Sequence, residues 1–448
     1  MTSTILFGLV LCGAGVGMQG ACLKAGVARV DITPAGPIWL SGYASRTHAS
    51  EGTLTHLSAK ALALESTSGG RVVFVTTDLI GLPRLLSDEV VARVKRQYGW
   101  KRPQLLLSAS HTHTGPMVWP NLSNLAVLPP GEQEKLVDYH RKLADELVTV
   151  VGKAIANLAP ATVEYGEGSV AFAVNRRQQT AVGVKIGVNP GGPVDHAVPV
   201  LKIADAGGKI VAILFGYACH NTTLTAETYQ LSGDYAGFAE AALENLHPGA
   251  TALFLMLCGG DQNPNPRGTV ELARQHGETL AYEVENVLVK SMMPIAGPIR
   301  TLFKLTRLRL APRTRQDFEA ELKSSVPAQA RRAALMLQAL DGGKRIDELD
   351  YPVQAVHFGH SLTVIALGGE VTVDYELRIK REYPGEPILT AGYANDVMCY
   401  IPSARVLREG GYEPVESMAY YGQAGPFADD VEDRIFAAIH QVLRGVGR

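Results

Sequence analysis

The chain of 448 residues has few cysteines, no block of basic residues and no internal repeat. Cys219, Cys258 and Cys399 lie beyond the N-terminal stretch, and their positions do not suggest a disulfide framework, so we expect buried thiols. The 42 basic residues nearly balance the 44 acidic ones. A protein that binds nucleic acid normally has a basic stripe, so the composition argues against nucleic acid as a partner.

Only the N-terminus carries a segment that resembles a targeting signal. An apolar stretch runs from Ile5 to about Met18 and is followed by small residues. This pattern predicts a signal peptide over residues 1–22, a single domain over 23–448, and a secreted or periplasmic protein. No later apolar run reaches the length that a transmembrane helix needs.

Short apolar runs alternate with helical patterns along the rest of the chain. Continuous runs of Val, Ile and Leu are typical of strands that are buried on both faces. The strand-like runs are 71–78, 104–110, 209–219, 250–258, 362–368 and 388–394. The helix-like segments are 86–99, 134–158, 236–246 and 274–290, with a charged helical excursion over 312–350. The alternation predicts an α/β (mixed α+β) fold in which helices cover a central sheet.

Five of the apolar runs lead directly into side chains that can do chemistry. These side chains are His111, His220, Asp261 with Asn263, Glu370 and Tyr400. Ligands of open α/β sheets bind at the carboxyl ends of the strands. We therefore expect the five strand ends to share one site.

The residue types at these strand ends suit a catalytic metal. Two imidazoles and one carboxylate, with a position left for water, are the ligands of catalytic zinc, and His111, His220 and Glu370 can supply them. In the segment SASHTHTGP (108–116), an extended backbone would project His111 and His113 to the same side, so that one binds the metal and the other lies beside it. Zinc would lower the pKa of a bound water to about 7.

Each of these residues also has a purely structural explanation. His220 would then be a hydrogen-bonded histidine, and Glu370 would cap a helix that begins near Val371. Tyr400 would be a buried tyrosine, and GGDQNPNP (259–266) a turn rich in Asn and Pro. In the catalytic alternative, the phenol of Tyr400 is a fourth metal ligand or donates to an oxyanion.

Seven segments together resemble the neutral (non-lysosomal) ceramidases. They occur in the same order as in that family and with similar separations. They are distributed over nearly the whole chain after the predicted signal peptide. They are DITPAGPIWLSGYA (31–44), SASHTHTGP (108–116), NRR (175–177), ACHNTTL (218–224), GGDQNPNP (259–266), LGGEVT (367–372) and NDVMCYIP (395–402). The family cleaves the N-acyl bond of ceramide and releases a fatty acid and a sphingoid base.

The resemblance implies roles for individual residues. His113 would lie beside the metal as a polar or catalytic group, and Arg176 would contact the substrate near the scissile amide. The implied substrate is a small-molecule or lipid N-acyl amide, and a lipid would be collected at a membrane surface. The implied zinc ligands are His111, His220, Glu370 and Tyr400.

Two departures from the family leave the substrate open. The family has a catalytic Ser where this chain has Asn263, whose amide can donate to an oxyanion but cannot be a nucleophile. We therefore expect zinc-activated water as the nucleophile, with Asp261 orienting its neighbours at the turn. The chain also ends soon after 395–402, so we expect no C-terminal β-sandwich domain.

Three hypotheses follow from these observations. The first is a zinc-dependent amidohydrolase similar to neutral ceramidase. The second is a zinc hydrolase that acts on a smaller amide or a lactam. The third is a non-catalytic binding protein with the same fold.

Overall fold

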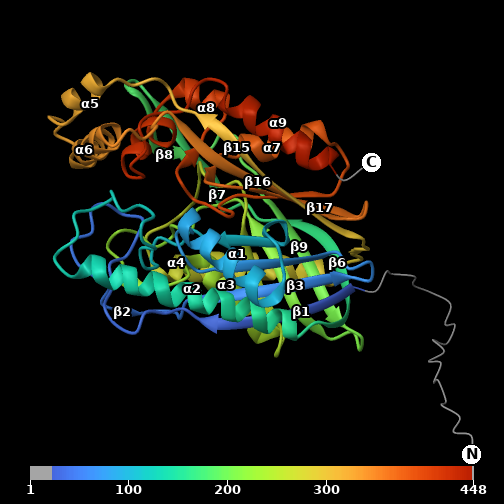
Figure 1. Ribbon diagram of the computed structural model, residues 1–448. Coiled ribbons are helices and arrows are strands. Elements are labelled where there is room, and N and C mark those ends of the chain that lie inside the picture. The colour runs from blue at the N-terminus through green and yellow to red at the C-terminus, as the bar shows by residue number, and fades with distance from the viewer. Residues whose placement is uncertain (1–22, 446–448) are drawn as a thin grey trace, which may run out of the picture.

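Two β-sheets pack against each other, and helices cover their outer faces, in this computed structural model of residues 23–445 (Figure 1). The predicted signal peptide, 1–22, lies outside the described residues. The larger sheet has nine strands, eight of them in the order β12–β10–β9–β6–β1–β3–β4–β5, with β14 paired to β6. In chain order they are β1 (Leu23–Asp31), β3 (Ser58–Ser66), β4 (Arg71–Thr77), β5 (Leu105–Ala109), β6 (Ala159–Ser169), β9 (Ala197–Asp205), β10 (Ile210–Tyr217), β12 (Thr251–Met256) and β14 (Met293–Pro294).

The second sheet has four strands in the order β15–β16–β17–β19. They are β15 (Ile299–Arg309), β16 (Glu348–Phe358), β17 (Leu362–Leu367) and β19 (Ile388–Ala391). Three short ladders complete the strands: β2 (Gly52–Thr53) with β11 (Gln230–Leu231); β13 (Gln262–Pro264) with β7 (Ala173–Thr180) and β8 (Gly183–Asn189); and β18 (Glu370–Val371) with β20 (Tyr400–Ile401).

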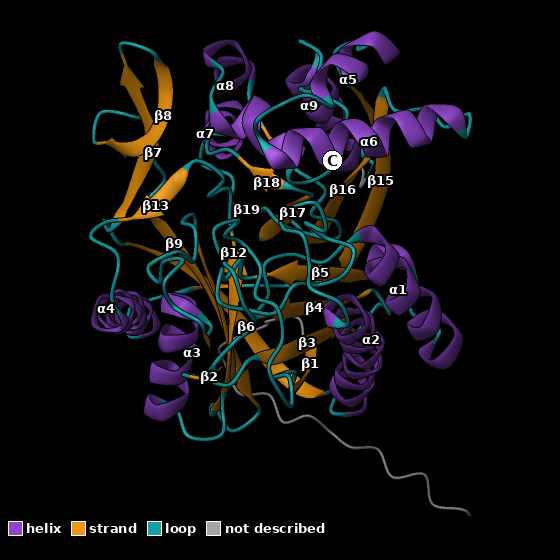
Figure 2. Ribbon diagram, turned by 90° about the vertical axis from the view of Figure 1, so that its left-hand side faces the viewer, coloured by secondary structure: helices purple, strands orange, loops and turns teal. Residues whose placement is uncertain are grey.

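The helices form the two outer layers. Helices α1 to α4 cover the larger sheet, whereas α7 and α9 pack on the smaller one (Figure 2). No helix within residues 23–445 is long and apolar enough to cross a membrane. The helices are α1 (Arg84–Tyr98), α2 (Glu132–Ala156), α3 (Asp234–Leu246), α4 (Val270–Leu288), α5 (Arg315–Glu321), α6 (Pro327–Asp341), α7 (Asp374–Glu382), α8 (Ala404–Glu409) and α9 (Val431–Arg444), with short turns η1 (Arg102–Gln104), η2 (Tyr412–Glu416) and η3 (Ser417–Ala419).

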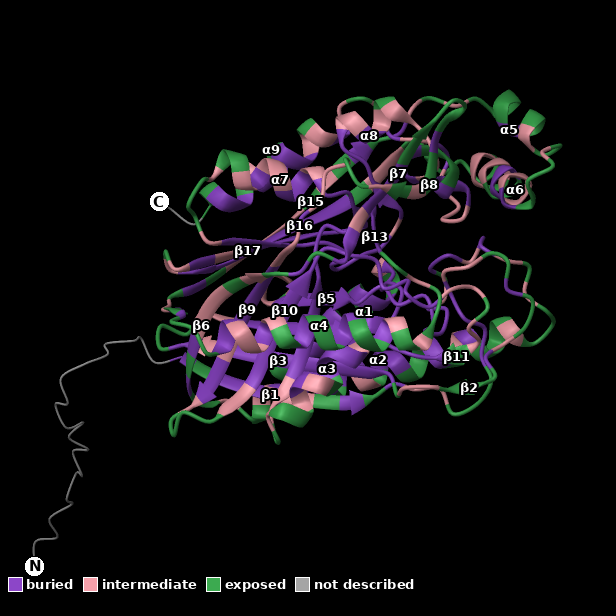
Figure 3. Cartoon of the chain, turned by 180° about the vertical axis from the view of Figure 1, so that it is seen from behind, coloured by how far each residue is buried: buried purple, intermediate pink, exposed green. Residues whose placement is uncertain are grey.

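Strands β4, β5, β10 and β12 of the larger sheet are buried on both faces, as the continuous apolar runs predict (Figure 3). In β4, Val73 and Val75 pack under α1 and α2, whereas Phe74 packs between the two sheets. Burial of each such side chain stabilises the fold by about 1.5–3 kcal/mol. The mixed α/β fold is thus confirmed, and a second sheet is added to the predicted one.

The three cysteines and part of the charged segment 312–350 contribute to the hydrophobic core. The three thiols of Cys219, Cys258 and Cys399 are buried and free, as predicted. The charged segment 312–350 is helical in α5 and α6, but it is more than a surface excursion. Phe318 in α5 and Ala333 in α6 are fully buried. The apolar faces of these two helices pack with residues of the second sheet in one core cluster.

One short segment, 391–395, joins the two edges of the larger sheet. Ala394 forms a bridge to Ser108 in edge strand β5, and Ala391 forms a bridge to Leu257, which follows edge strand β12. The sheet is therefore curled so that its two edges approach the same piece of chain. This arrangement brings the carboxyl ends of β5, β10 and β17 to one place.

Asn395 holds this junction together. Its backbone N–H donates to the carbonyl of Leu107 at 2.7 Å, and its side-chain oxygen accepts from the N–H of Leu107 at 3.2 Å. Its amide nitrogen donates to Gln354 at 2.8 Å. The backbone of Asn395 has φ 68°, the left-handed region that Asn tolerates better than most residues.

We expect the substitution Asn395→Ala to lower the free energy of unfolding by about 3 kcal/mol, because it leaves buried partners unsatisfied and strains the backbone. Asn395→Gly removes the same side-chain hydrogen bonds without that strain, so it should be less destabilising by about 1 kcal/mol. Urea unfolding of both variants measures the difference. A glycine variant that is no more stable than the alanine variant would contradict this account of the junction.

Candidate metal centre and the cavity above it

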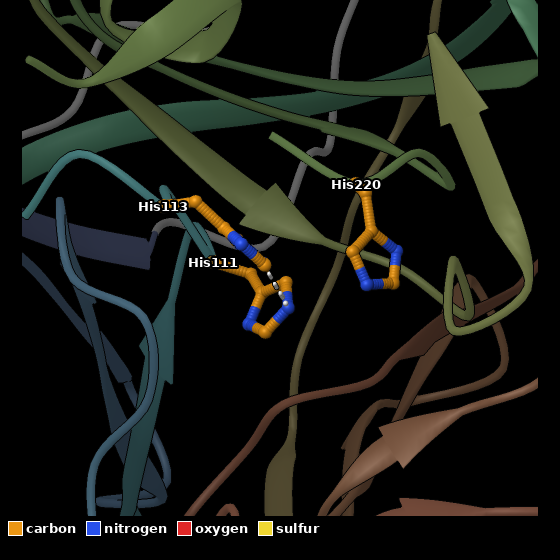
Figure 4. A group of neighbouring side chains, drawn as sticks. All are labelled: His111, His113 and His220. Atoms are coloured by element: carbon orange, nitrogen blue, oxygen red, sulfur yellow. Dashed lines mark hydrogen bonds between the residues drawn. The ribbon is translucent and has the colours of Figure 1, made fainter. Parts of the chain in front are cut away.

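His111 leaves β5 through a left-handed residue and not through an extended one. Its φ is 63°, which costs about 1–2 kcal/mol for a residue other than glycine. The prediction of an extended segment was therefore wrong at this position. The two histidines nevertheless meet, since the Nε2 atoms of His113 and His111 are 3.1 Å apart (Figure 4).

His220 and Glu370 reach the same point from other strands. His220 follows β10, and Glu370 begins β18 just after β17. The Nε2 atoms of His111 and His220 lie 2.9 Å and 3.1 Å from the same oxygen, Oε2 of Glu370. These three side chains are at most 3% exposed. The structure thus brings the three predicted zinc ligands from separate elements into direct contact.

The protonation of these groups favours a bound cation. The Nδ1 atoms of His111 and His220 lie 2.6 Å and 2.7 Å from the backbone carbonyls of Ile80 and Gly259, which can only accept. Each Nδ1 therefore carries the ring proton, and a neutral ring has no second proton to offer to Glu370. Burial, reinforced by the charge of Arg176, lowers the pKa of His220 to about 3, so that ring is neutral. The Nε2 atom of His220 and the carboxylate of Glu370 are thus acceptors that face each other, and a metal ion between them would remove their repulsion, so the residues fit a metal site.

Two tyrosines flank this centre. The hydroxyl of Tyr421 donates to Oε1 of Glu370 at 2.5 Å, which orients the carboxylate. The hydroxyl of Tyr400 lies 3.1 Å from Nε2 of His220. Tyr400 was predicted from its place after a strand, whereas Tyr421 carries no sequence signal beyond its place near the end of the chain.

A cavity of about 270 Å³ opens above the metal centre. Among the residues that line it are four that were predicted as catalytic: His113, Arg176, Asn263 and Tyr400. Its other walls are largely aromatic or apolar and include Tyr43, Leu125, Ile186, Tyr412 and Tyr420.

Arg176 is held rigidly at the edge of this cavity. It donates from Nε to Glu413 at 2.8 Å, from Nη1 to the side-chain oxygen of Asn263 at 3.3 Å, and from Nη2 to the hydroxyl of Tyr400 at 2.9 Å. Burial lowers the pKa of Arg176, but Tyr400 and Glu413 outweigh burial and hold that pKa well above its usual value. The guanidinium is therefore a fixed positive charge, and Glu413 is a supporting residue that no motif identified.

Asn263 and Asp261 have different places in the site. The side-chain oxygen of Asn263 accepts from Arg176 and lies 3.4 Å from the hydroxyl of Thr222, which leaves its amide nitrogen for a ligand. Asp261 is fully buried and is not among the cavity-lining residues. Its carboxylate accepts from the N–H of Val373 at 2.8 Å and from the side chain of Asn175 at 3.1 Å, so it ties β7 to the segment after Glu370.

Gly42 lies against the ring of His113. A Cβ atom at this position would lie 2.4 Å from Nδ1 of His113, and the φ of Gly42 is +91°. Close approach and backbone conformation therefore both require glycine here. Gly42 belongs to the segment 31–44, which the sequence marked without assigning it a role.

We expect Gly42→Ala to lower the free energy of unfolding by about 2 kcal/mol or more, because the added methyl group displaces the buried imidazole. Gly36→Ala is the matched control, since no atom of the described residues lies within 4 Å of a Cβ atom there. It should change stability by less than about 0.5 kcal/mol. Urea unfolding compares the two, and equal stabilities would refute the proposed contact between Gly42 and His113.

The buried carboxyl of Asp261 predicts a pH dependence. Burial raises its pKa from 3.8 to about 6, so its contribution to stability is complete below pH 3.8 and is lost as the pH rises through 6. Relative to Asp261→Asn, the wild-type free energy of unfolding should therefore fall by up to about 3 kcal/mol across this range. Denaturant unfolding at several pH values measures this difference. The exposed substitution Asp429→Asn is the control, and a difference for Asp261→Asn that does not vary with pH would contradict the assignment.

The chain is similar in sequence to proteins of one known family. Residues 23–286 match the family described as neutral/alkaline non-lysosomal ceramidase, N-terminal. The chain is 30% identical to the neutral ceramidase of Pseudomonas aeruginosa over 255 residues, which cover 54% of this chain and 37% of that protein. It is 28% identical to neutral ceramidase 1 of Arabidopsis thaliana over 261 residues, or 56% of this chain and 32% of that protein. The matched part thus spans about a third of the length of these relatives.

The fold extends the similarity beyond the matched segment. The crystal structure of neutral ceramidase from Pseudomonas aeruginosa superposes with a TM-score of 0.73 at 21% identity and covers 95% of this chain and 75% of that one. Glu370 and Tyr400 lie beyond residues 23–286, so their place beside His111 and His220 comes from the fold. Because more than half of the chain matches the family, the protein belongs to the neutral/alkaline non-lysosomal ceramidases.

Proposed function

We propose that the protein is a zinc-dependent amidohydrolase that cleaves an N-acyl bond such as that of ceramide. The observation that carries this proposal is the meeting of His111, His220 and Glu370, in which both Nε2 atoms lie 2.9–3.1 Å from the same carboxylate oxygen. Membership of the ceramidase family supports an amide as the bond that is broken. Secretion or a periplasmic location, and collection of a lipid substrate at a membrane surface, complete the proposal.

His111, His220, Glu370 and Tyr400 would hold the metal. Imidazole and oxygen ligands suit zinc, and the second coordination shell is supplied by the carbonyls of Ile80 and Gly259. When bound, zinc acts as a Lewis acid and makes water a nucleophile near neutral pH.

The cavity walls supply the other catalytic functions. Arg176 and the amide nitrogen of Asn263 would stabilise negative charge on the oxygen of the substrate amide, since both are polar donors held in a buried wall. Burial lowers the pKa of His113 well below its usual value, so its ring is neutral and has one nitrogen that donates and one that accepts a hydrogen bond. We assign His113 to orienting water or relaying a proton to the leaving amine. Asp261 acts through Asn175 and Val373, as a positioning residue.

The size of the cavity supports a second candidate substrate. Its volume of about 270 Å³ is slightly below that of most small-molecule sites, which are usually about 300–1,000 Å³. An N-acyl amide smaller than ceramide therefore fits the same chemistry. The absence of a Ser at position 263 is compatible with both substrates, because neither needs a protein nucleophile when water is activated.

The test is a measurement of metal and hydrolysis on the same preparation. We expect about one zinc per chain by mass spectrometry, and chelator-sensitive hydrolysis of ceramide or of shorter N-acyl amides. His220→Ala should lose the metal and at least about 100-fold in kcat/KM. His56→Ala changes an exposed histidine away from the cavity and should leave both unchanged. Metal-free protein that hydrolyses these amides at the full rate would refute the proposal.

A further inference from the structure

A second cavity of about 400 Å³ adjoins the one above the metal centre. The two share Ala44, Leu125 and Tyr420 in their walls, so they lie side by side, and together we call them the substrate trough. The second cavity is lined mainly by apolar side chains such as Trp39, Val127 and Val326. The trough therefore leads from a polar reaction site to an apolar compartment.

The charges that line the trough all have the same sign. Arg176 and Arg267 line the first cavity, and Arg46 and Arg331 line the second, whereas no Asp or Glu lines either one. The charge of Arg176 is balanced by Glu413 at 2.8 Å. Anionic ligands are thus favoured over cationic ones.

Arg267 is the charge that lacks a counterion beside the reaction site. Within residues 23–445 its guanidinium makes a single hydrogen bond, from Nη2 to the hydroxyl of Tyr43 at 2.9 Å, and its buried Nε has no acceptor. Tyr43 donates in turn to the carbonyl of Leu224 at 2.9 Å. Burial raises the pKa of Tyr43 to about 12, so this phenol is neutral and does not balance the charge of Arg267.

The carboxylate of Asp234 is not the missing counterion of Arg267. Asp234 and Glu227 both interact with Arg267 electrostatically, but neither forms an ion pair with it among the described residues. Asp234 has other partners. Its oxygens accept from the N–H groups of Leu224 at 2.9 Å and Tyr235 at 2.6 Å. The positive charge of Arg267 therefore faces the cavity with donor capacity left for a ligand.

We propose, on the basis of the amidohydrolase function above, that the trough binds N-acylated amino acids. The substrate carboxylate accepts from Arg267, the adjoining amide lies over the metal centre, and the acyl chain extends past Leu125 and Tyr420 into the apolar second cavity. An amino-acid carboxylate is separated from its amide nitrogen by one carbon atom, which suits an arginine in the same small cavity as Arg176 and Asn263.

The test is binding of two ligands that differ only in charge. N-(dodecylsulfonyl)glycine and N-(dodecylsulfonyl)glycinamide carry a sulfonamide in place of the amide, so calorimetry measures binding without turnover. We expect the wild-type protein to bind the acid about tenfold more tightly than the neutral ligand. Arg267→Gln should abolish this preference, and Arg267→Lys should retain part of it because the charge remains.

Two further variants locate the effect. Arg96→Gln removes an exposed arginine that does not line the trough, and should keep the full preference. Loss of the preference in Arg331→Gln but not in Arg267→Gln would place the acidic group in the second cavity and overturn the proposal. Equal binding of the two ligands by the wild-type protein, or equal weakening of both by Arg267→Gln, would also overturn it.

The binding proposal and the amidohydrolase proposal can fail independently of each other. Ceramide hydrolysis without a preference for the acid refutes the role of Arg267 and leaves the amidohydrolase intact. Preferential binding of the acid by a protein that hydrolyses no amide supports the trough and refutes the hydrolase. In an active preparation, the ratio of kcat/KM for N-lauroylglycine and N-lauroylglycinamide should follow the binding preference and should fall in Arg267→Gln.

Discussion

The pairing of one segment, 391–395, with both edges of the larger sheet is the constraint on which the site depends. Strands β5 and β12 stand at opposite ends of the strand order, so a flat sheet would keep them far apart. The bridges to Ser108 and Leu257 curl the sheet and bring its edges to the same piece of chain. His111, which follows β5, can then meet His220, which follows the neighbour of β12. The same segment continues β19 of the second sheet, and the N–H groups of Tyr393 and Ala394 donate to the carbonyls of Gly369 and Leu367, which holds Glu370 at this point.

The centre formed in this way has a surplus of acceptor atoms. The carbonyl of Gly259 holds the Nδ1 proton of the neutral His220, so the Nε2 lone pair of that ring faces the carboxylate of Glu370. This arrangement is unfavourable in a buried place unless a cation lies between them. The left-handed backbone of His111 adds strain of the kind that the surrounding structure must support. Around this centre, Tyr421 orients Glu370, and Glu413 holds Arg176. A metal ion at this point would both relieve these unfavourable contacts and supply the chemistry of the site.

The parts of the fold that could be predicted from the sequence are those whose burial is complete. The runs at 71–78 and 209–219 carry charged residues only at their ends because both faces of β4 and β10 are covered. Strand β15 was not predicted, since its sequence IRTLFKLTRLR alternates charged and apolar residues and its side chains are mostly half-buried or exposed. Strands β1 and β3 are rich in Ala and carry Lys, which weakens their strand pattern. The second sheet could not be predicted from the sequence, because β15, its longest edge strand, mixes charged and apolar residues.

The sequence by itself determined which residue types follow the buried strands, because a strand that is apolar on both faces ends abruptly where polar groups begin. His111, His220, Glu370 and Tyr400 were identified for this reason. Only the tertiary structure decided which groups support them. Tyr421, Glu413 and Arg267 act through partners that are 51, 237 and 224 positions away in the chain. Such contacts depend on how the two sheets pack and how the larger sheet curls, and no local spacing of residues encodes either of these.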